Sequence, residues 1–185
     1  MTVAAPLTFP LAGLLAEPPG TTRAWEVHGV TIPLPDDLRL VDPIEGTVEV
    51  ARTNRGVLVR AGLRTAIAGT CARCLRDIEV PIEIELDEEA LPSVDLASGA
   101  PLDLSAEPDV ARLTAHHELA LGPLVGDAIS LAEPIAPLCE ATCPGLCPTC
   151  GERLGPSHAV HVEDAIDPRL EALRGFRVDA GDESE

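Results

Sequence analysis

Polar and apolar residues alternate one by one along three consecutive stretches of the chain, residues 44–51, 57–64 and 78–87. Alternation with a period of two is typical of β-strands that bury one face and expose the other. Asn54-Arg55-Gly56 supplies turn residues between the first two stretches. The pattern therefore predicts an antiparallel meander with one buried face.

Further segments are expected to flank or border this sheet. Leu7–Gly20 is apolar and ends in Pro-Pro-Gly, which predicts a short helix or an extended segment followed by a loop. Trp25–Leu34 has the composition of a strand, which Pro33 and Pro35 would close. Pro81 has no backbone N–H, so the third strand should lie at an edge, or place Pro81 where no donor is needed.

A helix is expected after the sheet segments. Apolar residues recur three or four positions apart from Leu121 to Ala132, and Pro134 ends the pattern. Gly122 and Gly126 weaken this helix, because glycine loses more backbone freedom than other residues. We expect the helix to pack on the bare face of the sheet.

A second helix is expected near the C-terminus. Pro168 suits the first turn of a helix, and Asp167 before it can cap the free N–H groups. Leu170 and Leu173 would form its apolar face. The polar tail, residues 176–185, is expected to be disordered.

The charge of the chain limits its partners. Its 185 residues include 31 acidic side chains against 13 arginines and no lysine, a net charge of −18. Residues 75–110 alone hold eleven acids and one basic residue, Arg76. Such a surface repels phosphate backbones, and two Phe, one Trp and no Tyr provide no platform for stacking bases. Tight, direct nucleic-acid binding is therefore disfavoured. The acids of residues 75–110 are interpreted either as a solvated surface or as a docking surface for a basic protein.

Four cysteines fall within twelve residues, at Cys139, Cys143, Cys147 and Cys150. The last two form a Cys-Pro-Thr-Cys-Gly knuckle, in which two thiolates can bind one ion and Gly151 allows a left-handed turn. Tetrahedral zinc is the common use of such spacing in a protein without signs of secretion. The four cysteines therefore predict a structural Zn²⁺ site.

Other ligand sets remain open. Cys71 and Cys74 form a second Cys-x-x-Cys pair, which could join the knuckle cysteines around one ion. His158 or His161 could replace a thiol. The local set of four cysteines is favoured, because bringing neighbouring residues together orders less chain. Cys71 and Cys74 could also be buried structural residues or a redox couple.

No catalytic arrangement is present in the sequence. It has no glycine-rich phosphate loop, no nucleophile elbow and no His-Glu-x-x-His motif. A zinc ion with four thiolates has no open position for water or substrate. We therefore expect that the protein is not an enzyme. The first ten residues lack the basic segment of a signal peptide, and no apolar run reaches about 18 residues, so we expect a cytoplasmic protein.

These segments predict an α+β fold, an antiparallel β-meander packed by one or two helices, with a small zinc ribbon-like or knuckle-like appendage. The expected domains are a sheet domain, residues 1–134, with an acidic linker at about 92–108, and a cysteine-rich metal-binding segment with the terminal helix, residues 135–175. The tail, residues 176–185, follows.

Several motifs carry a family resemblance. Cys71-Ala-Arg-Cys-Leu75, the helix segment Leu121–Pro134, and Cys143-Pro-Gly-Leu-Cys-Pro-Thr-Cys-Gly151 occur in this order, followed by Asp167-Pro-Arg169. In combination they resemble the bacterial large ribosomal RNA subunit accumulation protein family (YceD-like). Some relatives are similar in keeping the first cysteine pair while lacking the C-terminal cluster, which favours an independent metal site there. Relatives often carry further cysteines after the knuckle, where this chain has His158 and His161.

The resemblance implies a role in accumulation of large-subunit (23S) ribosomal RNA and no known enzymatic activity. The resulting hypothesis is a metal-stabilised accessory factor for large-subunit assembly. Its partner would be a ribosomal or ribosome-assembly protein, in the context of a precursor of the large subunit. The alternative hypothesis is a redox-responsive switch or chaperone-like factor, in which thiols release zinc on oxidation.

Overall fold

The computed structural model describes residues 7–35, 38–103, 105, 107–159, 161, 168–173 and 176. Asp167 and the tail residues 177–185, for which a helix cap and disorder were expected, lie outside the described residues. Within the described part of the chain, no helix is both long and apolar enough to cross a membrane.

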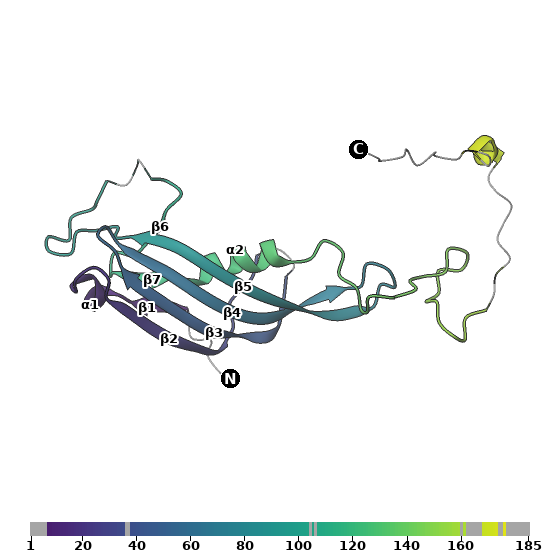
Figure 1. Ribbon diagram of the computed structural model, residues 1–185, viewed down its shortest axis with the longest axis horizontal. Helices are drawn as coiled ribbons and strands as arrows, with labels where there is room; N and C mark the ends of the chain where they lie inside the picture. The colour runs from purple at the N-terminus through teal and green to yellow at the C-terminus, as the bar shows by residue number, and fades with distance from the viewer. Residues whose placement is uncertain are drawn as a thin grey trace, which may run out of the picture. The chain divides into compact units, whose positions relative to one another are not determined.

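The elements follow one another in a mostly β order (Figure 1). They are β1 (Thr8–Pro10), α1 (Ala12–Leu15), β2 (Thr22–Val30), β3 (Leu40–Arg52), β4 (Val57–Thr70), β5 (Asp77–Leu91), β6 (Ala111–Arg112), β7 (Glu118–Ala120), α2 (Gly122–Ala132) and a 3-10 helix (Pro168–Leu173). This arrangement confirms the predicted α+β class.

Five strands form one sheet in the order β2-β3-β4-β5-β6. The predicted meander of β3, β4 and β5 is antiparallel throughout, and β5 pairs with β6 in parallel only at Ala90 and Leu91. Pro81 pairs opposite Ala66 of β4, on the stretch of β5 that β6 does not reach. Its missing N–H therefore falls at an edge, as predicted.

A second, two-stranded sheet pairs a strand near the N-terminus with the strand that precedes α2. β1 pairs antiparallel with β7, with Phe9 opposite Leu119. The sequence indicated a helix or extended segment at residues 7–20, and the structure has both, β1 followed by α1. The pairing of β1 with a strand more than a hundred positions away was not expected.

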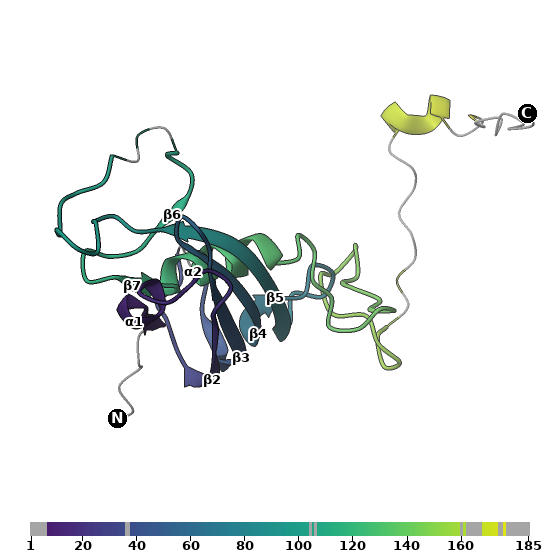
Figure 2. The same cartoon turned by 60° about the vertical axis from the view of Figure 1, so that its left-hand side comes forward.

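The core lies between the five-stranded sheet and the segments that cover one of its faces (Figure 2). Val48, Val59 and Ile84 point from three strands into it, and Val125 and Ile129 of α2 are buried in the same cluster. The helix begins with Pro123 in its first turn. It ends before Pro134, as the sequence predicted. Alternation thus identified the face of each strand that points into the core.

Gly46 of β3 has a structural reason to be glycine. Its φ is +144°, and a Cβ at this position would collide with the backbone carbonyl oxygen of Gly62 on β4. Strand β3 also shifts register between Leu40 and Glu45. A side chain here would push β3 and β4 apart.

The chain divides into two compact units, Met1–Cys143 and Pro144–Glu185. We call the first the sheet domain and the second the C-terminal unit. The boundary follows Cys143, whereas the sequence placed it at residue 134, so residues 135–143 belong to the sheet domain. The terminal helix is a 3-10 helix, and Leu170 and Leu173, expected to form its apolar face, are exposed.

Candidate metal centres and charged sheet face

The structure sorts six cysteines and two histidines into two groups of four. Cys71, Cys74, Cys139 and Cys143 form one group, which lies entirely in the sheet domain and is here named the four-cysteine cluster. Cys147, Cys150, His158 and His161 form the other, which lies entirely in the C-terminal unit and is named the cysteine–histidine cluster. Within each group the potential ligand atoms all lie within 4.8 Å of one another.

This grouping differs from the ligand sets favoured by spacing. The four cysteines between 139 and 150 are divided between the two units, and Cys71 and Cys74 join Cys139 and Cys143 instead of the Cys147–Cys150 knuckle. Both His158 and His161 join the knuckle, where the sequence indicated that one of them could replace a thiol. Metal ligation by either group remains a prediction.

The chain around residue 72 explains why the four-cysteine cluster forms. The N–H of Ala72 donates a hydrogen bond to the carbonyl oxygen of Pro137 (2.8 Å), and Arg73 Nη1 donates to the carbonyl oxygen of Cys143 (3.0 Å). These contacts hold residues 137–143, which follow α2, against the turn between β4 and β5. Ligands that are close in sequence cost less chain entropy to bring together. Long-range hydrogen bonds outweigh that advantage here, and the sequence pattern did not reveal them.

The sulfur separations in the four-cysteine cluster fit a tetrahedral metal ion. Cys71 Sγ lies 3.8 Å from Cys143 Sγ, and Cys74 Sγ lies 3.7 Å from Cys139 Sγ. Four sulfurs at ~2.3 Å from one zinc ion are separated by roughly 3.8 Å along each edge of the tetrahedron. Thiols in ordinary packing have no reason to form such a quartet, so the residues present fit a four-thiolate site.

The acid–base properties of the sulfurs fit the same reading. The backbone N–H of Cys74, followed by those of Cys139 and Arg73, lowers the pKa of Cys71 to about 6. The pKa of Cys139 is raised to about 12, first by its hydrogen bond with Cys143, then by burial and by contacts with Cys74 and Cys71. Amide groups therefore favour one thiolate, while close sulfurs disfavour a second negative charge. A divalent cation would remove that conflict and allow all four to bind as thiolates.

The two Cys-x-x-Cys turns have the same backbone hydrogen bonds. The N–H of Leu75 donates to the carbonyl oxygen of Cys71 (3.0 Å), as the N–H of Gly151 does to that of Cys147 (2.8 Å). The N–H of Cys71 donates to the carbonyl oxygen of Arg76 (2.8 Å), and Cys147 pairs with Glu152 in the same way (2.7 Å). Both pairs are therefore built as knuckles.

The cysteine–histidine cluster is more open. Cys150 is exposed. Its Sγ lies 3.3 Å from Nε2 of His158. This distance is close to the ~3.5 Å expected between a sulfur and a nitrogen ligand of one zinc ion. The rings of His158 and His161 are 5.1 Å apart between centroids. A hollow of about 550 Å³, lined in part by Cys147, Leu154 and both histidines, borders this cluster. Two sulfurs and two imidazole nitrogens form a donor set that suits zinc.

Hydrogen bonds also shift the pKa values in this knuckle. The N–H of Cys150, followed by that of Thr149, lowers the pKa of Cys147, and the N–H of Thr149 lies 3.4 Å from its sulfur. The N–H of Glu152 acts to lower the pKa of Cys150, but desolvation and the neighbouring Cys147 together raise it above its ordinary value. Cys147 is therefore the thiol of this pair that ionises more readily.

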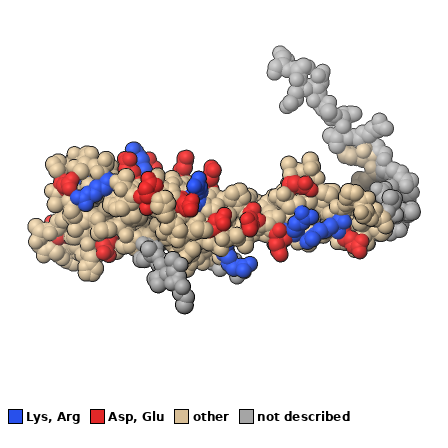
Figure 3. All heavy atoms as spheres, turned by 90° about the horizontal axis from the view of Figure 1, so that it is seen from below, with Lys and Arg blue, Asp and Glu red and all other residues tan. Residues whose placement is uncertain are grey.

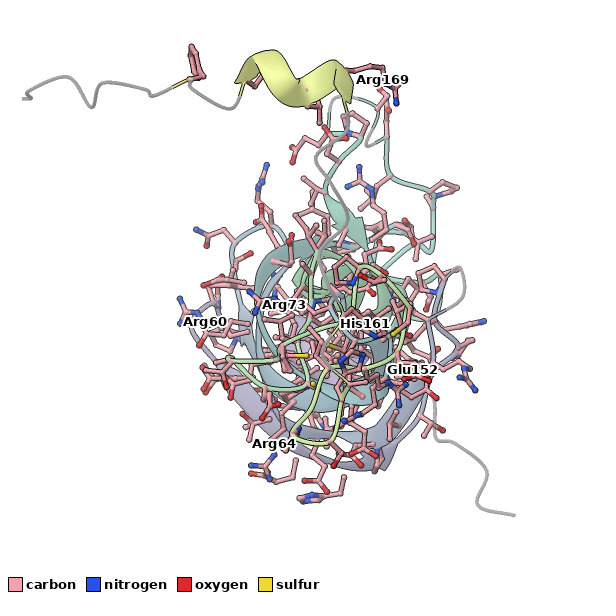
Figure 4. All side chains as sticks on the ribbon, turned by 90° about the vertical axis from the view of Figure 1, so that its right-hand side faces the viewer. Arg60, Arg64, Arg73, Glu152, His161 and Arg169 are labelled. Carbon is pink, nitrogen blue, oxygen red and sulfur yellow. The ribbon has the colours of Figure 1, made fainter. Side chains whose placement is uncertain are left out.

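A second candidate feature is the exposed face of the sheet. On this face, residues that are paired across β3, β4 and β5 form rows in which an arginine of β4 lies between two acids. Arg60 lies between Glu49 of β3 and Asp87 of β5. Arg64 lies between Glu45 of β3 and Glu83 of β5. Arg60 Nε lies 3.2 Å from Asp87, and Arg64 Nη2 lies 3.1 Å from Glu45. Both arginines point outward from the sheet (Figure 4).

The row between these two is open. Gly62 stands there between Thr47 and Glu85, and a Cβ at Gly62 would meet no atom within 4 Å. A hollow of about 550 Å³ covers this part of the face. Acidic side chains outnumber the arginines along the sheet domain (Figure 3). Glu83 and Glu85 take part in no ion pair among the described residues. We call the exposed residues of these three rows the acidic face.

Comparison with known proteins places the chain in a family. The family model described as Large ribosomal RNA subunit accumulation protein YceD matches residues 59–177, a range that contains both clusters. Proteins of Mycobacterium bovis and Mycobacterium tuberculosis, described as uncharacterised, are 32% identical over 178 residues, covering 92% of this chain and 81% of theirs.

A further uncharacterised protein, from Mycobacterium leprae, is 28% identical over 127 residues, covering 68% of this chain and 55% of its own. No solved structure matches the chain. The extent of the family match and of the mycobacterial matches establishes that this chain belongs to the YceD family of large ribosomal RNA subunit accumulation proteins.

Proposed function

We propose that the protein is a non-enzymatic accessory factor for assembly of the large ribosomal subunit or for accumulation of its 23S rRNA. Family membership is the observation that carries this proposal, because the family's description names accumulation of large-subunit ribosomal RNA. The protein would act in the cytoplasm by binding a partner.

Zinc at both clusters would stabilise the binding protein. The tetrahedral sulfur separations in the four-cysteine cluster support this, since four thiolates complete the coordination of zinc and leave no position for a substrate. The cysteine–histidine cluster likewise offers four ligands. Metal at these positions is expected to order segments that have few apolar residues of their own.

The partner would be a ribosomal or ribosome-assembly protein, in the context of a precursor of the large subunit. The acidic face supports a basic protein partner, because Glu83 and Glu85 carry charge that no arginine in the described part of the chain neutralises in an ion pair. The net charge of −18 argues against tight direct contact with the ribosomal RNA.

Depletion of the protein tests the biological role. We expect the ratio of large-subunit to small-subunit ribosomal RNA to fall, and the purified protein to co-sediment with large-subunit precursors. The double variant Glu83→Lys/Glu85→Lys should weaken that association by roughly tenfold at low salt.

The variant Glu88→Lys/Glu133→Lys is the matched control. It makes the same charge change, but Glu88 lies on the opposite side of β5, where it pairs with Val59. It should associate nearly as well as the wild type. An unchanged ribosomal RNA ratio after depletion, with no co-sedimentation, would reject the proposed role.

A redox-responsive zinc switch is the second candidate, and one observation favours it. Cys150 is exposed, and its neighbour Cys147 has a lowered pKa, which increases its thiolate fraction. Peroxide could convert these two thiolates to a disulfide, with two protons taken up, two water molecules formed and zinc released. Reversible loss of zinc that changes partner binding would support this function over a purely structural role.

A further inference from the structure

The outer side of α2 carries an apolar side chain that the core does not use. Leu131 is 88% exposed, whereas Leu75, the next most exposed leucine of those described in the sheet domain, is 59% exposed. Ile135, three residues after the helix, is fully exposed as well. Neither Leu131 nor Ile135 belongs to the hydrophobic core or packs against it. Core packing therefore gives no reason for apolar side chains at these two positions.

A hollow of about 410 Å³ lies beside the first half of the same helix. Residues of α2, of the segment 31–35 after β2 and of the paired strands β1 and β7 contribute to its lining. Among the described residues that line it, Thr8, Thr31 and Asp127 are polar, and the others are Ala, Gly, Ile, Leu and Pro. The lining that the structure describes is thus mostly apolar, and Asp127 is its one charged residue.

Two glycines of α2 leave this hollow open. Gly122 and Gly126 both line it and are one helical turn apart. A Cβ at Gly122 would meet no atom within 4 Å, and a Cβ at Gly126 would meet only the Cδ of Pro35, at 3.8 Å. Neither position supplies a side chain to fill the space, which leaves room for one from another molecule.

Leu131 extends the surface that begins at the hollow. It lies one turn after Asp127, so the two side chains project from the same side of the helix. The positions from Gly122 to Leu131 rise about 14 Å along the helix axis. A small molecule in the hollow would leave Leu131 exposed, whereas a protein segment lying along the helix would cover both. We call the hollow, Asp127 and Leu131 together the α2 surface.

The charge of this region has one sign. Between His117 and Arg153 the sequence has no basic residue and five acidic ones, of which Asp127 is one. Asp127 is exposed, and it takes part in no ion pair in the part of the chain that the structure describes. Covering an unpaired carboxylate is costly unless a cation accompanies the contact. An occupant of the α2 surface must therefore bring apolar groups for the hollow and Leu131, and a cation for Asp127.

We propose that the α2 surface binds a segment of a protein partner in which apolar side chains stand beside lysine or arginine. An apolar side chain of that segment enters the hollow, and a cation pairs with Asp127. A second copy of this chain does not fit, because it would place acidic surfaces against each other. Nucleic acid does not fit either, because the net charge of −18 repels phosphates.

The α2 surface is separate from the acidic face. Val125 and Ile129 of α2 pack on the core side of the sheet, whereas Glu83 and Glu85 lie on its exposed side. The inference goes beyond the proposed function and does not rest on it. Charge reversal on the acidic face is therefore expected to leave binding at the α2 surface unchanged.

A photoreactive benzoylphenylalanine at position 131 of the full-length protein, in intact cells, identifies the occupant. The expected result is a cross-link to a defined peptide of another protein that contains apolar residues next to lysine or arginine. Position 96 is the control, because Leu96 is also exposed but lies in the loop after β5. A cross-link to RNA, to this chain or to a peptide without basic residues, or none above the control, would overturn the proposal.

Affinity for the cross-linked peptide, made synthetically, tests the contacts. Asp127→Lys/Leu131→Gln should weaken its binding to the full-length protein at least roughly tenfold, as expected for loss of a buried leucine and an ion pair. The matched control Asp109→Lys/Leu96→Gln makes the same changes at exposed positions outside the hollow and should bind like the wild type. All four side chains are exposed, so Tm should stay within about 1 °C in both variants. Equal affinity of the two variants would refute the proposal.

Gly126→Ala tests whether the hollow itself is occupied. The added methyl group would take up space in the hollow at an ordinary contact distance from Pro35, and alanine favours the helix over glycine. Tm should therefore not fall, while affinity for the peptide should drop about threefold. Wild-type affinity in this variant would mean that no side chain enters the hollow.

The identity of the cross-linked protein separates this inference from the proposed function. A ribosomal or ribosome-assembly protein would support both. A peptide of the expected chemistry from a protein unconnected with the ribosome, with the predicted affinity losses, would support the α2 surface and count against the proposed function.

Discussion

The two cysteine-containing clusters contain the same type of turn, but they differ in their burial and in the sequence distance to their remaining ligands. Each begins with a Cys-x-x-Cys knuckle closed by the same pair of backbone hydrogen bonds. In the four-cysteine cluster the remaining ligands come from far along the chain, with 72 positions between Cys71 and Cys143. In the cysteine–histidine cluster Cys150 and His158 are only 8 positions apart.

Burial follows the same division. Cys71 is fully buried, and Cys74 and Cys143 are 4% and 2% exposed, whereas Cys150 is exposed beside a hollow. An ion in the four-cysteine cluster would join residues 137–143 to the β4–β5 turn and restrict a long loop. An ion in the cysteine–histidine cluster would order only its own segment. The same local motif can thus belong to a buried site that links distant segments of the chain, or to an accessible site whose ligands lie close together in sequence.

The largest expected difference is in the stability of the sheet domain. Cys71→Ser should lower its Tm by about 10 °C, because loss of a structural metal usually costs several kcal/mol and each kcal/mol corresponds to ~2–4 °C in a chain of this size. Cys150→Ser should leave the same transition within about 1 °C. Thermal unfolding followed by near-ultraviolet absorption of Trp25 would report the sheet domain directly. Equal changes in Tm in both variants would contradict the distinction between a site that links distant segments and a local site.

The rate of metal release to a chelator is the next largest difference expected between the two clusters. The exposed cysteine–histidine cluster should lose zinc to a chromogenic chelator at least roughly tenfold faster than the buried four-cysteine cluster, since exchange requires access to the ion. Two kinetic phases of equal amplitude are expected for the wild type. Cys150→Ser should abolish the fast phase and Cys71→Ser the slow one. A single phase in the wild type would mean that the clusters are not kinetically distinct.

Peroxide sensitivity should show a smaller difference in the same direction. The Cys147–Cys150 pair should be oxidised several-fold faster than Cys71 and Cys74, because access favours reaction even though Cys71 has a lowered pKa in the metal-free protein. Alkylation of the remaining thiols and mass spectrometry of the peptides would give the order. Earlier loss of Cys71 and Cys74 would show that pKa outweighs burial.

The smallest effect concerns the glycine of the second knuckle. Gly151→Ala places a Cβ at a φ of +75° and should destabilise this turn by roughly 1 kcal/mol, weakening metal affinity of the cysteine–histidine cluster about fivefold. Competition titration with a zinc buffer would measure it. Gly155→Ala, at a position where a Cβ meets no atom within 4 Å, is the control and should change nothing. An unchanged affinity in Gly151→Ala would indicate that the knuckle adapts.

The sheet could be predicted because its signal is local. Alternation in residues 57–64 and 78–87 identified both the strands and their buried faces, and Pro134 marked the end of α2. The pairing of β1 with β7 could not be predicted in this way. Phe9 and Leu119 meet because both cover the same core, and no short-range pattern records that contact.

The ligand types could be predicted better than their grouping. Cysteine spacing indicated two knuckles, and His158 and His161 stood where further ligands were expected. The assignment of Cys139 and Cys143 depended on loop-closure entropy, which favours near neighbours. Hydrogen bonds from Ala72 and Arg73 to the segment 137–143 reverse that preference, and they exist only once α2 lies across the sheet.

Metal stoichiometry tests the central claim of two separate sites most directly. Elemental analysis would compare the wild type with two double variants, Cys71→Ser/Cys139→Ser and Cys139→Ser/Cys147→Ser. Two sites grouped as in this structure predict two zinc ions in the wild type, one in the first double variant and none in the second. One ion in the wild type, or one ion retained by Cys139→Ser/Cys147→Ser, would contradict the account.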